Sequence, residues 1–378
     1  MHVLGLQDPL GTRRVWVALA QTVLAAAAAI AVCLFARYAI SLQQFGRTLV
    51  FRTFVFSVLF LWGSRAVLWR LSGATPKRIG CVMAGESLRR FVAQTLNHPL
   101  PIDLVKAPVD GDVADADVVE FLFRSDVKEV IVTKREDRRD LWLACLNRGM
   151  QVTDISVFVE REYYKIPCGD IDLSWFLTIN LRWNHPFYIR LKRLWDIIAS
   201  LIGLVLSTPV MGLGIIAILL ETGRPVFYSQ TRVGFGGRPY KLWKLRTMGV
   251  NAESGGAQWA TKSDPRVTRV GQILRRMRVD ELPQFWNVLR GEMSIIGPRP
   301  ERPEFVEMLS HEIPIYPQRH WIKPGITGWA QINYPYGASV EDAFEKLCYD
   351  LYYIKNASLM LDLHIALRTI GALMKGSR

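Results

Sequence analysis

The chain has 378 residues, of which 50% are hydrophobic, and its formal net charge is +13. This composition favours anionic partners at a membrane, such as lipid headgroups, phosphates or nucleotides. The sequence has no zinc-finger spacing, helix-turn-helix signal or RNA-binding aromatic motif, so nucleic acid is excluded as an expected partner. The five cysteines are scattered without a CxxC pair, which is typical of a reducing compartment and predicts no structural zinc site.

Two apolar runs open the chain, at residues 15–40 and 49–71, and the second is interrupted by Arg52 and Arg65. The first run is long enough to cross a bilayer and too long for a cleavable signal peptide. Arg13 and Arg14 precede the first run, and Arg65, Arg70, Lys77 and Arg78 close or follow the second, which favours both ends on the cytoplasmic side under the positive-inside rule. The sequence therefore predicts two transmembrane helices within residues 1–73.

Short strands and helices alternate over residues 76–167, which predicts a small Rossmann-like parallel α/β domain. The strands are expected at residues 78–83, 102–108, 129–133 and 152–158, and the helices at 86–97 and 136–149. The first turn lacks the GxGxxG fingerprint of dinucleotide-binding domains. A structural or regulatory role is therefore expected for this domain, and its ligand stays open.

A third apolar segment, residues 187–222, has basic residues on both sides, among them Arg193 and Arg224. Ser207, Thr208 and Pro209 fall in its middle. Proline removes a helix hydrogen bond, and neighbouring hydroxyl groups can bond to the freed carbonyls. Matched basic flanks favour a re-entrant helix hairpin, with its break at Ser207–Pro209, that returns to the cytoplasmic side. An ordinary kinked span is the alternative, and it would place everything after it in the periplasm.

Most of the positive charge falls between Phe187 and Pro303, interleaved with aromatic residues and glycines. Arginines in this stretch are suited to two-pronged contacts with phosphate oxygens. Asp280 and Glu281 stand side by side among them. Such a pair can hold Mg²⁺, or one carboxylate can attack phosphorus while the surrounding cations keep it ionised. The alternative is that Asp280 caps a helix start.

From Phe187 onward the chain resembles the bacterial sugar transferase family, the monotopic phosphoglycosyl transferases. The matching segments cover nearly all of this half, in order. They are KRLWDIIASLIGLVLSTP, GRPVFYSQTRVGFGGRPYKLWKLRTM, DPRVTRVGQILRR, DELPQFWNVLRGEMSIIGPRPE, KPGITGWAQIN and YDLYYIKNASLMLDL. The whole chain is similar to the larger, exopolysaccharide-type members, although many of those carry four N-terminal spans where two are found here.

The resemblance implies transfer of a hexose 1-phosphate from a UDP-sugar to undecaprenyl phosphate with release of UMP. This is the first membrane step of exopolysaccharide or capsule repeat-unit synthesis. It also implies Mg²⁺ as cofactor and a mainly α catalytic domain over residues 223–378. That domain is expected on the cytoplasmic face of the bacterial inner membrane, in contact with membrane lipids.

The resemblance also implies roles for single residues. Asp280 is the nucleophile that forms a covalent phosphosugar intermediate, Glu281 is its partner, and both are candidate Mg²⁺ ligands. Four cations are expected on the substrate phosphates: Lys244, Arg246, Arg275 and Arg299.

Two other functions fit parts of the pattern. A lipid-linked glycosyltransferase would release UDP instead of UMP, and a non-catalytic membrane scaffold would use Asp280 only as a cap. The donor sugar is left open, with glucose or galactose expected from the family, and so is the oligomeric state, a homo-oligomer included.

Overall fold

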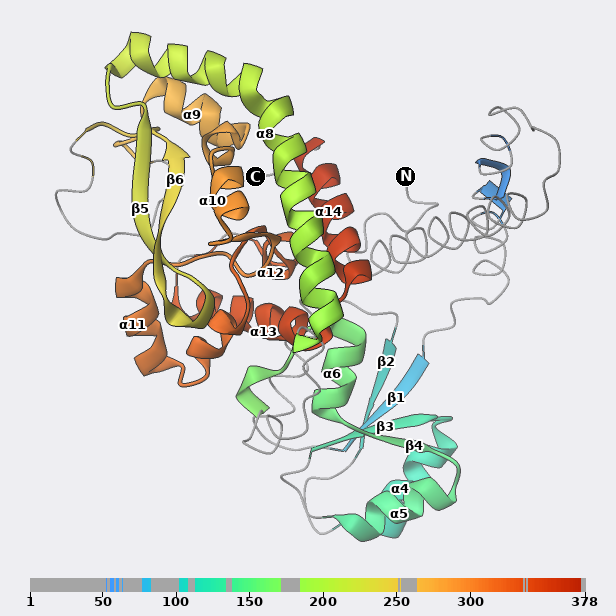
Figure 1. Cartoon of the computed structure of the whole chain (residues 1–378). Helices are drawn as coiled ribbons and strands as arrows, with labels where there is room; N and C mark the ends of the chain where they lie inside the picture. Colours follow the sequence, from blue (N-terminus) through green and yellow to red (C-terminus); the bar gives the residue numbers. More distant parts are fainter. Residues whose placement is uncertain are drawn as a thin grey trace. The chain divides into compact units, whose positions relative to one another are not determined.

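The computed structural model divides the chain into two compact units, Met1–Tyr163 and Tyr164–Arg378 (Figure 1). It describes residues 52, 55–57, 59–60, 63, 77–82, 102–107, 113–133, 138–170, 184–250, 252, 264–335, 337 and 339–374. The predicted N-terminal spans fall almost entirely outside the described residues, and the few described between 52 and 63 are helical. The two spans and the predicted domain bounds therefore stay predictions.

The first unit contains a four-stranded sheet in the order β2-β1-β3-β4, and every neighbouring pair is parallel. Its strands are β1 (Lys77–Val82), β2 (Ile102–Lys106), β3 (Glu129–Val132) and β4 (Gln151–Asp154). Its helices are α4 (Asp115–Arg124), α5 (Arg139–Asn147) and α6 (Ile155–Tyr163). The predicted parallel α/β arrangement is thereby confirmed.

Successive residues of β3 pack into two different hydrophobic cores. Val130 and Val132 join the core made with α4 and α5, whereas Ile131 joins the core made with α6. Side chains alternate between the two faces of a strand, so helices on both faces bury the whole of β3. Gly80 has a packing role here, because a Cβ atom on it would lie 2.7 Å from the Leu122 side chain.

The prediction for residues 152–158 is partly wrong, because the strand ends at Asp154 and helix α6 starts at Ile155. The Asp154 carboxylate accepts a hydrogen bond from the backbone N–H of Ser156, which turns the chain into the helix. Ile155, Phe158 and Val159 are buried at helical spacing. The sequence analysis also missed α4, and the helix predicted at residues 86–97 lies outside the described residues.

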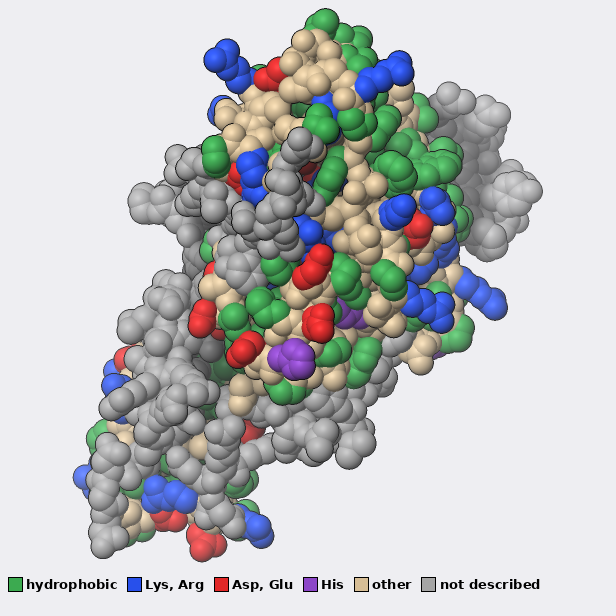
Figure 2. All heavy atoms as spheres, turned by 90° about the vertical axis from the view of Figure 1, so that its left-hand side faces the viewer, with side chains coloured by type: hydrophobic (Ala, Val, Ile, Leu, Met, Phe, Trp, Pro, Cys, Tyr) green, Lys and Arg blue, Asp and Glu red, His purple; other side chains and the backbone are tan. Residues whose placement is uncertain are grey.

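Helix α8 (Pro186–Thr222) is in the second unit and runs for 37 residues. Among the described residues it is the one helix long and apolar enough to cross a membrane. Many of its apolar side chains are exposed, including Leu206 at 72% and Leu220 at 83%. Figure 2 shows hydrophobic side chains at the top of the molecule, where one arm of α8 lies, with basic side chains near them. Exposure of this extent suggests association with a membrane.

The segment forms one continuous helix, α8, that changes direction partway along (Figure 1), and the re-entrant break expected at Ser207–Pro209 stays a prediction. Proline 209 lies inside the helix, and internal prolines bend helices by removing one hydrogen bond. The hydroxyl groups of Ser207 and Thr208 both donate to the Leu204 carbonyl, at 3.2 and 2.7 Å. The hydrogen bonds that remain, with these two added, hold the helix together through the bend.

The rest of the second unit is built from short elements. The strands are β5 (Phe227–Val233) and β6 (Pro239–Leu245), which form an antiparallel hairpin around η4 (Phe235–Gly237), and the parallel pair β7 (Ser294–Ile296) and β8 (Gly325–Thr327). The helices are η2 (Cys168–Asp170), α9 (Arg269–Arg276), η5 (Val279–Glu281), α10 (Gln284–Arg290), α11 (Pro303–Glu312), η6 (Tyr316–Trp321), α12 (Trp329–Asn333), α13 (Val340–Asn356) and α14 (Leu359–Met374).

Helix α10 is fixed on two sides, and this fixes the η5 turn just ahead of it. The buried Asn287 side chain accepts from the Trp243 N–H and donates to the Lys241 carbonyl, which ties α10 to the hairpin. At the other side, the Arg193 guanidinium of α8 donates to the carbonyls of Val288 and Leu289, at 2.6 and 2.7 Å. Both carbonyls belong to the last turn of α10, where the regular helical hydrogen bonds end, and that of Val288 also accepts from the Gly291 N–H at 2.9 Å.

Candidate active site

A cavity of about 980 Å³ lies within the second unit. All six residues that the sequence analysis singled out for chemistry line it: Lys244, Arg246, Arg275, Asp280, Glu281 and Arg299. They come from β6, the segment after it, α9, η5 and the segment after β7, so the fold brings together positions far apart in the sequence. Their predicted roles are not thereby established, but a common cavity is the arrangement those roles require.

The η5 turn presents the two carboxylates. Arg278, just before η5, has a left-handed backbone with φ 58°, an uncommon conformation for a residue with a side chain. This residue reverses the chain between α9 and η5. Asp280 and Glu281 follow and are 6% and 8% exposed. Helix α10 begins later, at Gln284, with Pro283 at its N-cap position, so the alternative reading of Asp280 as the helix cap is wrong.

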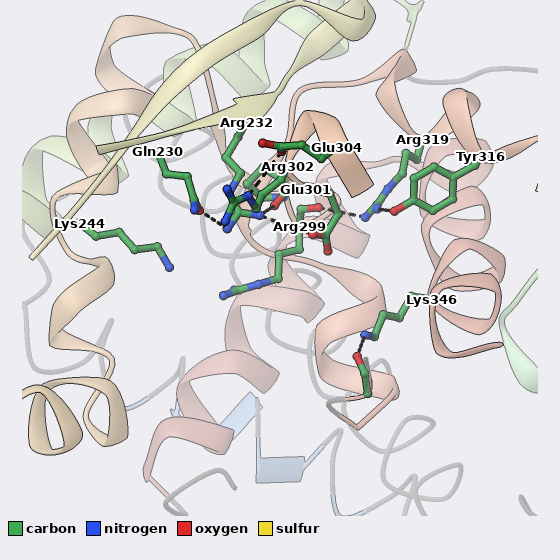
Figure 3. Close-up of polar contacts among 12 residues, drawn as sticks. Gln230, Arg232, Lys244, Arg299, Glu301, Arg302, Glu304, Tyr316, Arg319 and Lys346 are labelled. Atoms are coloured by element: carbon green, nitrogen blue, oxygen red, sulfur yellow. Dashed lines mark hydrogen bonds and ion pairs between the residues drawn. The ribbon is translucent and has the colours of Figure 1, made fainter. Parts of the chain in front are cut away.

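Glu281 is held by cations on several sides. Its Oε1 atom lies 3.2 Å from the Lys244 Nζ atom and 2.8 Å from an Arg299 Nη atom, and Arg278 is 3.7 Å from its other oxygen. Figure 3 shows the Lys244 and Arg299 side chains pointing toward one another. Although burial acts in the opposite direction, these cations hold the pKa of Glu281 far below its usual range. Glu281 is therefore a fixed anion that orients Lys244 and Arg299.

Asp280 differs from its neighbour. Within the described part of the chain, its carboxylate has no hydrogen bond or ion pair within contact distance. Burial raises the pKa of Asp280; Lys244 opposes this rise and the charge of Glu281 adds to it. An unengaged, poorly solvated carboxylate beside several cations is what the predicted role of Asp280 as a nucleophile requires.

The acidic limb of the pH profile of kcat/KM is expected to depend on Lys244. In its predicted role as nucleophile, Asp280 would attack only when ionised, so activity should fall as pH drops through its raised pKa. Lys244 lowers that pKa, so Lys244→Met should move the acidic limb of kcat/KM to higher pH. Lys241→Met, on the same strand but exposed and outside the cavity lining, is the matched control. An unmoved limb in Lys244→Met would show that Asp280 ionisation does not govern the rate.

Arg275 reaches the cavity because α9 packs closely on the segment after β6. The Arg275 Nε atom donates to the Thr247 hydroxyl at 2.8 Å. Gly271 makes this approach possible, since a Cβ atom there would lie 2.1 Å from the Thr247 carbonyl oxygen. The rest of the Arg275 guanidinium is then available to the cavity, as its predicted phosphate role requires.

Gly271→Ala is expected to push α9 away from Thr247 and to displace Arg275. Overpacking of this kind costs roughly 1–3 kcal/mol of stability, and turnover should fall as well. Thermal denaturation and a transfer assay on the purified protein measure the two effects. Gly212→Ala is the control, because a Cβ atom on this α8 glycine meets nothing within 4 Å. Equal behaviour of the two variants would contradict the packing argument.

Arg246 has a structural partner in addition to its place on the cavity wall. One of its Nη atoms donates to the Thr222 carbonyl and hydroxyl and to the Gly223 carbonyl, at 2.7–3.2 Å. These bonds close the C-terminal end of α8. Its Nε and other Nη atoms are buried and have no partner in the described structure. The predicted contact of Arg246 with phosphate stays a prediction, and only that unpaired edge is free for it.

The sequence analysis missed several cavity residues, above all Arg232, Tyr316, Arg319 and Asp350. Arg319 and Asp350 form a buried ion pair at 2.9 Å, and Arg319 also donates to the Tyr316 hydroxyl. Arg232 and Asp350 lie within segments that match the family, but nothing there singled them out, and Tyr316 and Arg319 lie between two such segments. The excess of arginine itself was the available signal.

The carboxylates fit the predicted Mg²⁺ only in part. The described residues contain no group of three or more His, Cys, Asp or Glu side chains placed to hold a metal ion. Mg²⁺ is commonly bound by one or two carboxylates together with substrate phosphates. The Asp280–Glu281 pair suits that mode, with Asp280 as the unengaged ligand, and a site made by protein side chains alone does not.

A carboxylate pair among arginines, beside a long apolar helix, is the arrangement of a protein that handles anionic groups next to a membrane. The sequence model of the bacterial sugar transferases matches residues 187–376. The chain therefore belongs to the bacterial sugar transferase family, as its sequence motifs indicated.

Named relatives are similar over the same half of the chain. It is 48% identical over 191 residues to a UDP-N-acetylgalactosamine-undecaprenyl-phosphate N-acetylgalactosaminephosphotransferase of Aeromonas hydrophila, which covers 50% of this chain and 45% of that protein. It is 55% identical over 132 residues to a putative undecaprenyl-phosphate N-acetylgalactosaminyl 1-phosphate transferase of Bacillus subtilis, covering 35% of this chain and 74% of that protein. It is 44% identical over 182 residues to a UDP-glucose:undecaprenyl-phosphate glucose-1-phosphate transferase of Escherichia coli, covering 48% of this chain and 39% of that protein.

The matched region thus spans less than half of the Aeromonas and Escherichia proteins.

Proposed function

We propose that this chain transfers a sugar 1-phosphate from a nucleoside diphosphate sugar to undecaprenyl phosphate and releases a nucleoside monophosphate. The observation that carries the proposal is Asp280, a buried carboxylate without a partner in the described structure, in a cavity lined by cations. The names of the relatives support the acceptor and the type of group transferred. Because those names include both glucose and N-acetylgalactosamine, the donor sugar stays open.

The proposed chemistry has two displacements at one phosphorus atom. In the first, an Asp280 oxygen bonds to the phosphorus that carries the sugar, and the bond to the bridging oxygen breaks as UMP leaves. In the second, an oxygen of undecaprenyl phosphate bonds to the same phosphorus and the Asp280–phosphorus bond breaks. Arg275 and Arg299 hold the phosphate oxygens, whose negative charge needs stabilising in both steps.

Mg²⁺ is part of the proposal. Asp280 and Glu281 would hold it together with donor phosphate oxygens, and it would neutralise charge on the departing phosphate. Glu281, held by Lys244 and Arg299, would keep those cations in place with or without the metal.

The product distinguishes this proposal from its closest rival. Membranes containing the chain are incubated with undecaprenyl phosphate and labelled UDP-glucose, UDP-galactose or UDP-N-acetylgalactosamine. The proposed reaction gives UMP and a lipid-linked sugar diphosphate. Release of UDP would instead identify an ordinary lipid-linked glycosyltransferase, and no transfer from any donor would favour a membrane scaffold.

We further propose that α8 enters the inner membrane from the cytoplasm and, by its bend, returns to it, so that the cavity faces the cytoplasm. The packing of α8 on α9, α10 and β7 within one compact unit supports this topology. The wider role, as the first membrane step of exopolysaccharide synthesis, rests on the family resemblance.

Cysteine labelling tests the topology. Arg238 is exposed near the tip of the β5–β6 hairpin, so Arg238→Cys gives an accessible thiol. Cys81, Cys145, Cys168 and Cys348 are buried, and Cys33 is replaced with Ser in this background. A membrane-impermeant reagent should label Arg238→Cys after lysis and leave it unlabelled in intact cells. Labelling of the intact cells would place the cavity outside and overturn the topology.

A further inference from the structure

The backbone that carries Arg299 is tied down at four consecutive carbonyl groups. The carbonyl of Pro298 accepts from the Gly325 N–H at 2.9 Å, and that of Glu301 accepts from the Val233 N–H at 3.0 Å. The two carbonyls between them, of Arg299 and Pro300, accept from arginine side chains. Loop carbonyls usually bond to water, so four protein donors in a row make this an unusually fixed segment.

Arg319, from η6, is the donor to the Arg299 carbonyl, at 3.0 Å. The same Nη atom donates to the Asp350 carboxylate of α13 at 2.9 Å, and the other Nη atom donates to the Tyr316 hydroxyl. Arg319 is 6% exposed. A planar guanidinium can serve three acceptors in fixed directions at once, which a lysine ammonium on its flexible stem cannot reproduce.

Arg232, from β5, is the donor to the Pro300 carbonyl, at 3.1 Å. Its other Nη atom donates to the Gln230 side chain at 2.6 Å, and Glu301 lies 3.5 Å away. Figure 3 shows Arg232 and Arg319 reaching this segment from opposite sides. Burial lowers the pKa of Arg232. The charge of Glu301 raises that pKa, and the charges of Arg299 and Arg302 lower it further, so the charged form of Arg232 is disfavoured by its surroundings.

Arg299 itself is in a different situation. Its side chain is 38% exposed, and one Nη atom contacts Glu281 at 2.8 Å. The direction in which it enters the cavity is set by its backbone, which the flanking prolines restrict at φ and which Arg232 and Arg319 hold by its carbonyls.

We propose that Arg232 and Arg319 are positioning residues, which hold the Pro298–Glu301 backbone so that Arg299 reaches both Glu281 and a substrate phosphate. This inference rests on the proposed function for the role of Arg299. Arg319 does not itself bind substrate, since both Nη atoms of its buried guanidinium already donate to Asp350, Tyr316 and the Arg299 carbonyl. The two residues act through Arg299, and their contribution disappears when Arg299 is absent.

A double-mutant cycle tests this dependence. Arg319→Lys and Arg232→Lys are made in the natural sequence and in an Arg299→Ala background, in the full chain. Misplacement of a positioned group by about 1 Å costs up to a hundredfold. Each Lys variant should therefore lower kcat by roughly ten- to a hundredfold with little change in KM, but by less than about twofold in the Arg299→Ala background. Arg161→Lys, which alters a guanidinium paired with buried Glu129 in the other unit, is the control.

Hydrogen exchange supplies a readout that does not need activity. The amides of Gly297, Arg299, Glu301 and Arg302, and those of Val233 and Gly325 that donate to this segment, should exchange faster in Arg319→Lys than in the unmutated chain, and they should be unchanged in Arg161→Lys. If no sugar donor supports transfer but hydrogen exchange of these amides rises, the proposed function is wrong, and the role of Arg319 in holding the Pro298–Glu301 backbone is supported. Unchanged exchange, a rise in KM alone, or full additivity with Arg299→Ala would overturn the positioning role. Should Arg319→Lys not fold, Arg232→Lys carries the same comparison.

Discussion

Replacing Asp280 with Asn is expected to abolish almost all transfer while leaving the fold intact. Asn has nearly the same size, and no hydrogen bond or ion pair of the Asp280 carboxylate is present in the described structure to be lost. The amide cannot form the covalent bond to phosphorus, so kcat should fall roughly a thousandfold or more, as expected for loss of a nucleophile. UMP release from the labelled donor measures the effect.

Two controls sharpen this test. Mass spectrometry of the unmutated protein with donor alone should detect a phosphosugar on the peptide that contains Asp280, and the Asn variant should carry none. Asp264→Asn alters another buried carboxylate, which bonds to Arg266 and lies outside the cavity lining. It should lower the melting temperature more than Asp280→Asn does. Near-normal turnover in Asp280→Asn would exclude Asp280 as the nucleophile.

Arg299→Lys is expected to lower kcat roughly a hundredfold, the usual cost of removing one donor that stabilises developing charge. Lysine keeps the charge but cannot contact Glu281 and a phosphate oxygen through separate, fixed N–H groups. Arg302→Lys is the comparison, because Arg302 follows in the same segment and also lines the cavity, but its guanidinium contacts Glu304, at 3.5 Å. Equal kinetics for Arg and Lys at position 299 would mean that only its charge matters.

The sequence could predict those helices and strands in which apolar and polar residues recur at a regular spacing. In the first unit, β1 to β4 and α5 were foreseeable because apolar residues follow the strand or helix period there. Helix α6 was missed because Val152–Phe158 also alternates over a short stretch, and only the turn at Asp154 settles the choice. The bend in α8 was foreseeable from Pro209, but its continuity was not, since both outcomes leave the same residues apolar.

The candidate site divides in a similar way. Asp280 and Glu281 are neighbours in sequence, so their pairing needed no fold to be noticed. The difference between the two carboxylates could be seen only in the fold, because Lys244 and Arg299 contact Glu281 and leave Asp280 without an ion pair in the described structure. Arg319 and Arg232 act on carbonyls 20 and 68 residues away, and a side chain that bonds to backbone leaves no pattern in the sequence.

The C-terminal end of α8 is bonded to the wall of the cavity through Arg246. Arg246 joins the last carbonyls of α8 to the wall of the cavity, with no intervening residue. With α8 in the bilayer as proposed, a change in lipid thickness that tilts the helix pulls directly on that wall. If the proposed topology and activity hold, acyl-chain length is expected to change turnover separately from the identity of the acceptor lipid.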